Sequence, residues 1–241
     1  MNFKTILACA ALLIGIGTAT AAVESDIVGY QTVEVTNGWT LLGVNFVGLE
    51  DASVNEIPVL SLISGEFSAG EQIQIPTANG YAIAEWNPAV NAWCTVSRGK
   101  VTTTPSTAKI SAGAGFWLKS TATPENPKVV QFAGKVYDGD EISVTLGQKY
   151  TIFSPLLPNE VAVNSDLLTW TNLEHGDQVQ IPTANGYEVA GWNSTLSKWC
   201  TISRNKVTTT PSTVAIKAGE SIWVVSTNAD ASVAFPSPIS E

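Results

Sequence analysis

Short runs in which polar and apolar residues alternate recur along the chain and predict β-strands. Gln72-Ile73-Gln74-Ile75 alternates in this way, as a strand with one wet face requires. The runs Tyr81–Trp86, Trp93–Val96 and Phe116–Ser120 are β-branched and aromatic, and turn-forming Gly, Pro and Asn bound them. No long helical period separates these runs. The pattern therefore predicts an all-β chain with a β-sandwich or barrel-like architecture.

Two local patterns add detail to this prediction. Asn87–Asn91 has the composition of a five-residue hairpin loop between two of the strands. One short helix is expected over residues 54–63, with Ser53 as its cap and Glu56 at the third position. Alternation places Ile83 and its neighbours at 81 and 85 on the opposite face of their strand from Trp86.

Two segments of the chain are copies of each other. Residues 70–107 align without a gap on residues 176–213, at a constant offset of 106, and most aligned positions are identical. The tryptophans and the cysteine of the first copy all recur in the second. A duplication of this length indicates two tandem homologous β modules.

The chain is expected to divide into three parts. Residues 1–22 are a predicted signal peptide, residues 23–130 the first β module and residues 131–241 the second. Lys4, the apolar run after it and the small residues TATAA are the features that a signal peptidase recognises. The stretch 122–128 (ATPENPK) is the expected linker, because its two prolines interrupt strand pairing.

Charge and hydropathy narrow the range of partners and compartments. The chain has a formal net charge of −9 and no basic cluster, so no nucleic-acid partner is expected. No segment after the signal peptide is long and apolar enough to predict a membrane span. The signal peptide predicts a secreted protein of the periplasm, the cell surface or the extracellular space.

The order of aromatic motifs resembles a group of exported proteins. Gly38-Trp39-Thr40-Leu41 reads G-W-x-L near the start of the first repeat, and Gly113–Trp117 reads G-x-x-[FY]-W near its end. These motifs are similar to those that open and close the modules of secreted bacterial two-repeat β proteins. The resemblance implies a surface or matrix role and transfers no catalytic residue. The second repeat departs from it, because Trp39 has no clear tryptophan counterpart there.

Paired tryptophans are the leading candidates for ligand contact. Flat sugar rings stack on exposed aromatic faces, and nearby amides bond hydroxyl groups. The candidate ligand-binding residues are Trp86, Trp93, Asn87, Asn91, Trp192, Trp199 and Asn193. Small β cores also bury tryptophan, so core packing stands as the alternative for these pairs.

No set of residues predicts catalysis, a metal site or a cofactor. His175 is the single histidine, and the first repeat has Ala69 in its place. Ser97–Lys100 and Ser203–Lys206 match S-x-x-K, but that chemistry needs a helix, and both segments follow predicted strands. One histidine and two mature cysteines do not predict a closed zinc site. We therefore expect a protein that is not an enzyme and holds no metal and no cofactor.

Cys94 and Cys200 are the only cysteines after the signal peptide, and they occupy equivalent positions. Export favours disulfides, so a Cys94–Cys200 bond is one interpretation. Free buried thiols and bonds between neighbouring chains are the other two.

Three hypotheses for function follow. The first is a secreted, non-enzymatic structural or interaction protein of the cell surface or extracellular matrix, whose partner is another copy of itself. The second is a two-site carbohydrate-binding protein whose partner is an extracellular polysaccharide, because duplication raises avidity. The third is a secreted hydrolase that uses paired carboxylates, with Glu85 as its weakest point because Gly191 replaces it in the second repeat.

Overall fold

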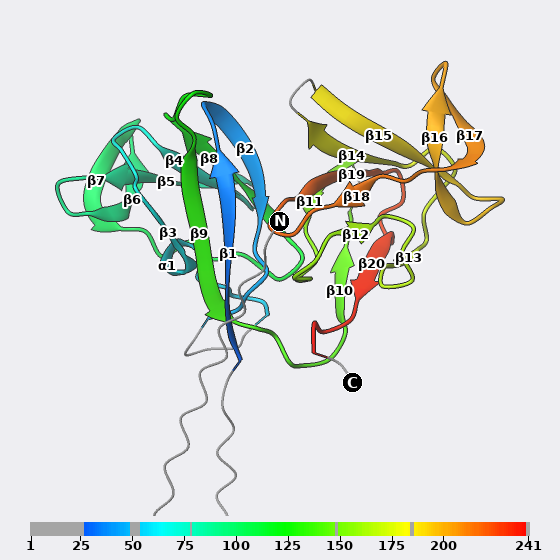
Figure 1. Ribbon diagram of the computed structural model, residues 1–241, viewed down its shortest axis with the longest axis horizontal. Coiled ribbons are helices and arrows are strands. Elements are labelled where there is room, and N and C mark those ends of the chain that lie inside the picture. The colour runs from blue at the N-terminus through cyan, green and yellow to red at the C-terminus, as the bar shows by residue number, and fades with distance from the viewer. Residues whose placement is uncertain (1–26, 49–53, 78, 148, 184–185, 240–241) are drawn as a thin grey trace, which may run out of the picture.

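The structure of the protein is a computed structural model, and it shows an all-β fold (Figure 1). It describes residues 27–48, 54–77, 79–147, 149–183 and 186–239. The predicted all-β class is confirmed. The predicted signal peptide lies outside the described residues. Within the described ranges, no helix is long and apolar enough to cross a membrane.

The first half of the chain forms two antiparallel sheets. Their strands are β1 (Val28–Val35), β2 (Gly38–Gly43), β3 (Ile63–Gly65), β4 (Gln72–Thr77), β5 (Gly80–Asn87), β6 (Ala92–Ser97), β7 (Lys100–Pro105), β8 (Gly115–Ser120) and β9 (Lys128–Lys135). The larger sheet has six strands in the order β2-β8-β4-β5-β6-β7. The smaller sheet has the order β1-β9-β3.

The second half repeats this arrangement. Its strands are β10 (Ile142–Thr145), β11 (Lys149–Phe153), β12 (Val161–Ala162), β13 (Thr169–Thr171), β14 (Gln178–Thr183), β15 (Gly186–Asn193), β16 (Lys198–Ser203), β17 (Lys206–Pro211), β18 (Ala215–Ile216), β19 (Ile222–Ser226) and β20 (Ser232–Phe235). A six-stranded sheet has the order β11-β19-β14-β15-β16-β17, and a three-stranded sheet has the order β10-β20-β13. β12 and β18 form a separate pair.

The strand registers of the two six-stranded sheets agree residue by residue within the duplicated segment. Gln74 pairs with Ile83, and Gln180 pairs with Val189 at the same offset of 106. Even the irregularity recurs, because the β6–β7 and β16–β17 ladders both shift register after their cysteine. Near-identical sequence has therefore produced identical pairing in the two halves.

β9 crosses the expected boundary between residues 130 and 131. It pairs along its whole length with β1, from Val28 opposite Lys135 to Val35 opposite Lys128. The segment 122–128, which is the expected linker, runs between β8 and β9 and ends on the first residue of β9. Residues 136–141 connect the two sets of sheets.

The expected helix over residues 54–63 is shorter than the sequence pattern indicates. α1 spans Val59–Leu62 and follows Pro58. The backbone of Ile57 exchanges two hydrogen bonds with Ile110, of 2.7 and 2.9 Å, so this part of the segment pairs as extended chain.

Alternation along the strands gives each six-stranded sheet a buried and an outer face. In the first half Ile73, Ile75 and Ala84 lie on the buried face, each at most 2 % exposed. Val179 and Ala190 do the same in the second half. Each large apolar side chain that is fully buried in this way contributes roughly 1.5–3 kcal/mol to folding.

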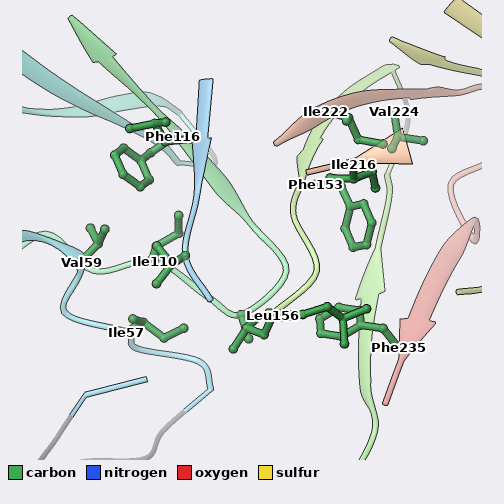
Figure 2. Close-up of a cluster of buried hydrophobic side chains, with 14 of the residues drawn as sticks. Ile57, Val59, Ile110, Phe116, Phe153, Leu156, Ile216, Ile222, Val224 and Phe235 are labelled. Atoms are coloured by element: carbon green, nitrogen blue, oxygen red, sulfur yellow. The ribbon is translucent and has the colours of Figure 1, made fainter. Parts of the chain in front are cut away.

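One continuous hydrophobic core joins the two halves. Figure 2 shows Phe116 and Ile110 from the first half on one side, and Phe153 and Phe235 from the second half on the other. Leu156 lies between these two groups and is fully buried. The sheets of the two halves therefore pack against each other through apolar side chains.

Equivalent backbone hydrogen bonds relate the two halves by an approximate twofold axis. The amide of Gly43 donates to the carbonyl of Gly219 at 2.9 Å, and the amide of Ser154 donates to the carbonyl of Gly113 at 3.0 Å. Gly113 and Gly219 are equivalent in the repeat. Gly43 is the last residue of β2, and Ser154 follows the last residue of β11, the equivalent strand. Each half therefore makes the same contact to the other, as an isologous interface requires.

Candidate functional site

The tryptophan pairs lie on the buried faces of the sheets. Trp93 is 5 % exposed and Trp199 is 0 % exposed, Trp192 is also buried, and Trp86 is half-buried against the core. The ring centroids of Trp86 and Trp93 are 5.4 Å apart, and those of Trp192 and Trp199 are 5.3 Å apart, both edge to face. Trp93 and Trp199 therefore present no open ring face to a sugar, and core packing is the interpretation that their burial supports.

Different residues complete the two tryptophan clusters. In the first half Phe67 packs 5.2 Å from Trp86 and 4.7 Å from Trp93. In the second half Trp170, on β13, lies 5.1 Å from Trp199 and donates its indole N–H to the carbonyl of Val163. The two aromatic clusters thus reach similar packing from non-equivalent positions.

The candidate asparagines organise the hairpin turns. Asn87 donates to the carbonyl of Thr102 at 2.7 Å and accepts from the amide of Ala89, and Asn193 bonds Thr208 and the amide of Thr195 in the same way. Both side chains are buried. Asn91 is exposed and has a φ of 51°, in the left-handed region that asparagine tolerates in turns. The side-chain amides of Asn87 and Asn193 are therefore used by the fold rather than offered to a ligand.

Cys94 and Cys200 are free thiols, and both are fully buried. They lie on β6 and β16, in different sheets. The structure therefore has neither the internal disulfide nor an exposed thiol at these positions.

The remaining candidate groups show no catalytic geometry. Ser97 pairs with Lys100 across the tight β6–β7 turn, in which Arg98 and Gly99 have positive φ, so this S-x-x-K segment is not helical. His175 is exposed in a turn. In the part of the chain that the structure describes, no three His, Cys, Asp or Glu side chains gather as metal ligands would.

Two buried carboxylates are functional groups that sequence reasoning missed. Glu71 is 1 % exposed, and it accepts hydrogen bonds from Ser68 N–H, Thr121 N–H and the Lys128 ammonium at 2.7, 2.9 and 2.8 Å. Burial opposes ionisation of Glu71, but the Lys128, Thr121 and Ser68 bonds outweigh it and hold the pKa of this carboxyl below its ordinary value.

Asp177 is the counterpart of Glu71 in the second half. It accepts from the Glu174 amide at 2.9 Å, from the Ser226 hydroxyl at 2.9 Å and from the Thr227 amide at 3.1 Å. In each half the carboxylate ties the loop before one strand to the end of another. The sequence signal for this pair was an acidic residue that follows the shared glycine in both repeats, at positions 106 residues apart.

An aromatic surface on the outer faces of the two sheets is the main candidate site. Side chains directly opposite in a sheet point to the same side, so Gln74 shares its face with Ile83 and Trp117, its partners on β5 and β8. Gln180 likewise shares its face with Val189 and Trp223. We call this surface the composite face: Trp39, Gln74, Tyr81, Ile83 and Trp117, with Tyr150, Gln180, Tyr187, Val189 and Trp223.

The two halves of the composite face meet at the approximate twofold axis. The ring centroids of Trp117 and Trp223 are 6.0 Å apart, and Tyr150 contacts Trp223 edge to face at 5.7 Å. Tyr150 takes the position of Trp39, which sequence comparison alone did not find. The composite face therefore continues from one sheet to the other.

Aromatic side chains on the composite face are open to solvent. Tyr81 is 48 % exposed and Tyr187 is 51 % exposed, and Trp39 and Tyr150 are exposed as well. Trp117 and Trp223 are half-buried where the halves meet. Large aromatic residues gathered on one face, without burial, are typical of a surface that contacts a partner.

A polar cleft of about 610 Å³ lies in the second half. It is lined by the segment 164–173, by Trp192 and by the β15–β16 loop. Asn164, in its wall, donates to the carbonyls of Trp199 and Ser212 and accepts from the Trp199 amide, so its amide is fully engaged. Because the composite face recurs in both halves, it is the stronger candidate.

Comparison of the chain with models of protein families, with curated proteins and with solved structures gave no match.

Proposed function

We propose that the protein is a secreted, non-enzymatic interaction protein of the cell surface or extracellular matrix, and that the composite face is its contact surface. The observation that carries this proposal is the placement of half-exposed aromatic residues on one surface shared by both sheets. Core residues of the sheets are fixed by burial, whereas the rings of Tyr81 and Tyr187 are about half exposed on the outer faces.

The carboxylates support a non-enzymatic role. Glu71 and Asp177 are closed to solvent and bonded by backbone amides, so they hold loops together and no substrate reaches them. Glu85 lies on the outer face and accepts a hydrogen bond from Gln72 at 2.8 Å, but its counterpart is Gly191. A hydrolase would need a second carboxylate beside Glu85, and Gln72 and Cys94, its neighbours across the strands, do not supply one.

Fractionation of cells that produce the protein tests the proposal. Tyr81→Ala/Tyr187→Ala removes one exposed ring from each half of the composite face and leaves the core untouched. We expect this variant to shift from the surface or matrix fraction into the medium, at unchanged stability. The matched control is Tyr30→Ala, which removes an even more exposed tyrosine ring from β1, away from the composite face. Equal retention of all three proteins would contradict the proposal.

A further inference from the structure

We propose that the occupant of the composite face is an extended, neutral polysaccharide that lies across both halves of the molecule. This inference rests on the proposed function and adds the chemical class of the partner.

The aromatic residues match the apolar faces of sugar rings. A pyranose ring presents a face of C–H groups, and an aromatic ring presents an electron-rich face of similar width. Tyr81 and Tyr187 offer exposed rings toward the outer parts of the two half-faces, and Trp117 and Trp223 offer half-buried indoles at the middle. The same sequence of platforms therefore occurs in both directions from the centre.

Glutamine amides match the hydroxyl groups of sugars. An amide both donates and accepts hydrogen bonds, as a hydroxyl does. The Gln74 side chain is half-buried between Ile83 and Trp117 and has no hydrogen-bond partner among the residues that the structure describes. Gln180 holds the same position between Val189 and Trp223, and its amide nitrogen bonds Gln178 at 3.1 Å. Each half-face thus offers a neutral polar group beside its aromatic rings.

Charge on the outer faces favours a neutral partner. In the first half Lys119 and Glu85 lie beside the composite face, and the Glu85 carboxylate is already bonded to Gln72. Their counterparts in the second half are uncharged, Val225 and Gly191. The chain as a whole carries a net charge of −9, which repels an acidic polymer. A neutral polymer avoids this repulsion and needs no charged partner on the face.

The extent of the composite face favours a polymer over a small ligand. Strands are about 4.8 Å apart, so the path from Ile83 through Trp117 and Trp223 to Val189 measures roughly 25 Å along the surface. The shared core and the backbone bonds of Gly43 and Ser154 hold the two half-faces in fixed positions. One chain that reaches both therefore gains the affinity of two linked contacts.

Affinity electrophoresis is the first test. Native gels that contain galactomannan, xyloglucan or hydroxyethylcellulose, all neutral, are compared with gels that contain alginate, an acidic polymer. We expect at least one neutral polymer to retard the wild-type protein and alginate not to. Tyr81→Ala and Tyr187→Ala should each lower the association constant roughly three- to tenfold. Gln74→Leu and Gln180→Leu should weaken binding too, whereas Tyr30→Ala should not.

Chain length is the second test. Oligosaccharides cut from the polymer that retards the protein should bind weakly while they cover one half-face, and much more tightly once they reach both. A Tyr187→Ala variant should lose most of this gain, because it disables one half-face. An affinity independent of length would overturn the proposal of an occupant that spans both halves.

Three outcomes would overturn the proposal of a neutral polysaccharide, and each would identify an alternative. Retardation by alginate alone would assign the face to an acidic polymer. A dimer in sedimentation velocity that Tyr81→Ala/Tyr187→Ala dissociates would assign it to a second copy of the chain. If no polymer retards the protein but the Tyr81→Ala/Tyr187→Ala variant still moves from the surface fraction into the medium, the proposed function as an interaction protein is retained. Its partner is then not a polysaccharide.

Discussion

Gly43 and Ser154 occupy equivalent positions in the two halves and lie against each other across the approximate twofold axis. A β-carbon on Gly43 would overlap the Ser154 side chain, whose hydroxyl donates to the carbonyl of Glu220 at 3.0 Å. Gly43 has no left-handed φ, so the glycine is required by this close approach and not by its own backbone.

Gly43→Ala should therefore destabilise the protein. Overpacking at a rigid contact costs about 1–3 kcal/mol, because the hydroxyl of Ser154 must give up its bond or the halves must separate. Urea unfolding monitored by tryptophan fluorescence measures the loss. Ser154→Gly in the Gly43→Ala background makes room for the new methyl group and should restore most of the stability. An unchanged midpoint for Gly43→Ala alone would show that the contact between the halves can accept a β-carbon without loss of stability.

Glu71 should make stability depend on acid pH. Its folded-state pKa lies below the ordinary value of 4.5, so its contribution is fully present above that value. The contribution is lost as the pH falls through the lowered folded-state pKa. Urea midpoints between neutral pH and about pH 2 measure this loss in the wild-type protein.

Glu71→Gln is the variant that isolates this effect. It should cost roughly 2 kcal/mol at neutral pH, because the new amide N–H groups face the donors of Ser68 and Thr121. Its midpoint should also fall less steeply with acid than that of the wild type. Glu34→Gln, at an exposed position on β1, is the control and should follow the wild-type curve. Parallel pH profiles for wild type and Glu71→Gln would refute this role.

Cys94 and Cys200 should resist thiol reagents in the folded protein. Both are 0 % exposed, and reaction requires an accessible thiolate. Alkylation of native protein should label neither, and alkylation after denaturation without reductant should label both on a monomer. Mass spectrometry of the two samples gives the count directly. Failure to label denatured protein would indicate a disulfide, either within the chain or between chains.

Truncation of Trp93 should lower the free energy of unfolding strongly, and truncation of Tyr81 should leave it almost unchanged. Trp93→Ala empties a core site and should cost about 3–5 kcal/mol, whereas Tyr81→Ala on the outer face should stay within about 0.5 kcal/mol of wild type. Trp93→Phe should be milder than Trp93→Ala, since it keeps an aromatic ring and deletes an indole N–H that has no partner among the described residues. A mild effect of Trp93→Ala would move this residue from the core to the surface.

Local sequence patterns predicted the strands well because alternation and turn residues act over a few positions. The pattern at Gln72–Ile75 became part of β4, and residues 88–91 of the predicted Asn87–Asn91 loop became the turn between β5 and β6, with Asn87 as the last residue of β5. The same reasoning treated the prolines of residues 122–128 as a linker. Prolines interrupt strand pairing in a loop within a module as well as in a linker between modules. They therefore could not show that the chain after residue 128 returns to the first half, where β9 pairs with β1.

Contacts between distant residues were beyond the reach of that reasoning. Glu71 meets Ser120 and Thr121 about fifty positions later, and the periodicity around Glu71 contains no sign of them. The composite face was missed for the same reason. Alternation places its members on one side of each sheet. The two sides form one surface only because Trp117 contacts Trp223 where the two halves meet, and that contact depends on how the halves pack.

The two halves have similar sheets but differ in the small residues that meet at the approximate twofold axis. Gly43 meets Ser154, and a β-carbon on Gly115 would likewise overlap Ser221, which donates its hydroxyl to the carbonyl of Leu42 at 2.7 Å. Both glycines belong to the first half and both serines to the second. Two copies of the second half would bring serine against serine, and two copies of the first would leave gaps. The chain is in effect a heterodimer carried on one polypeptide, and neither half can substitute for the other in that partnership.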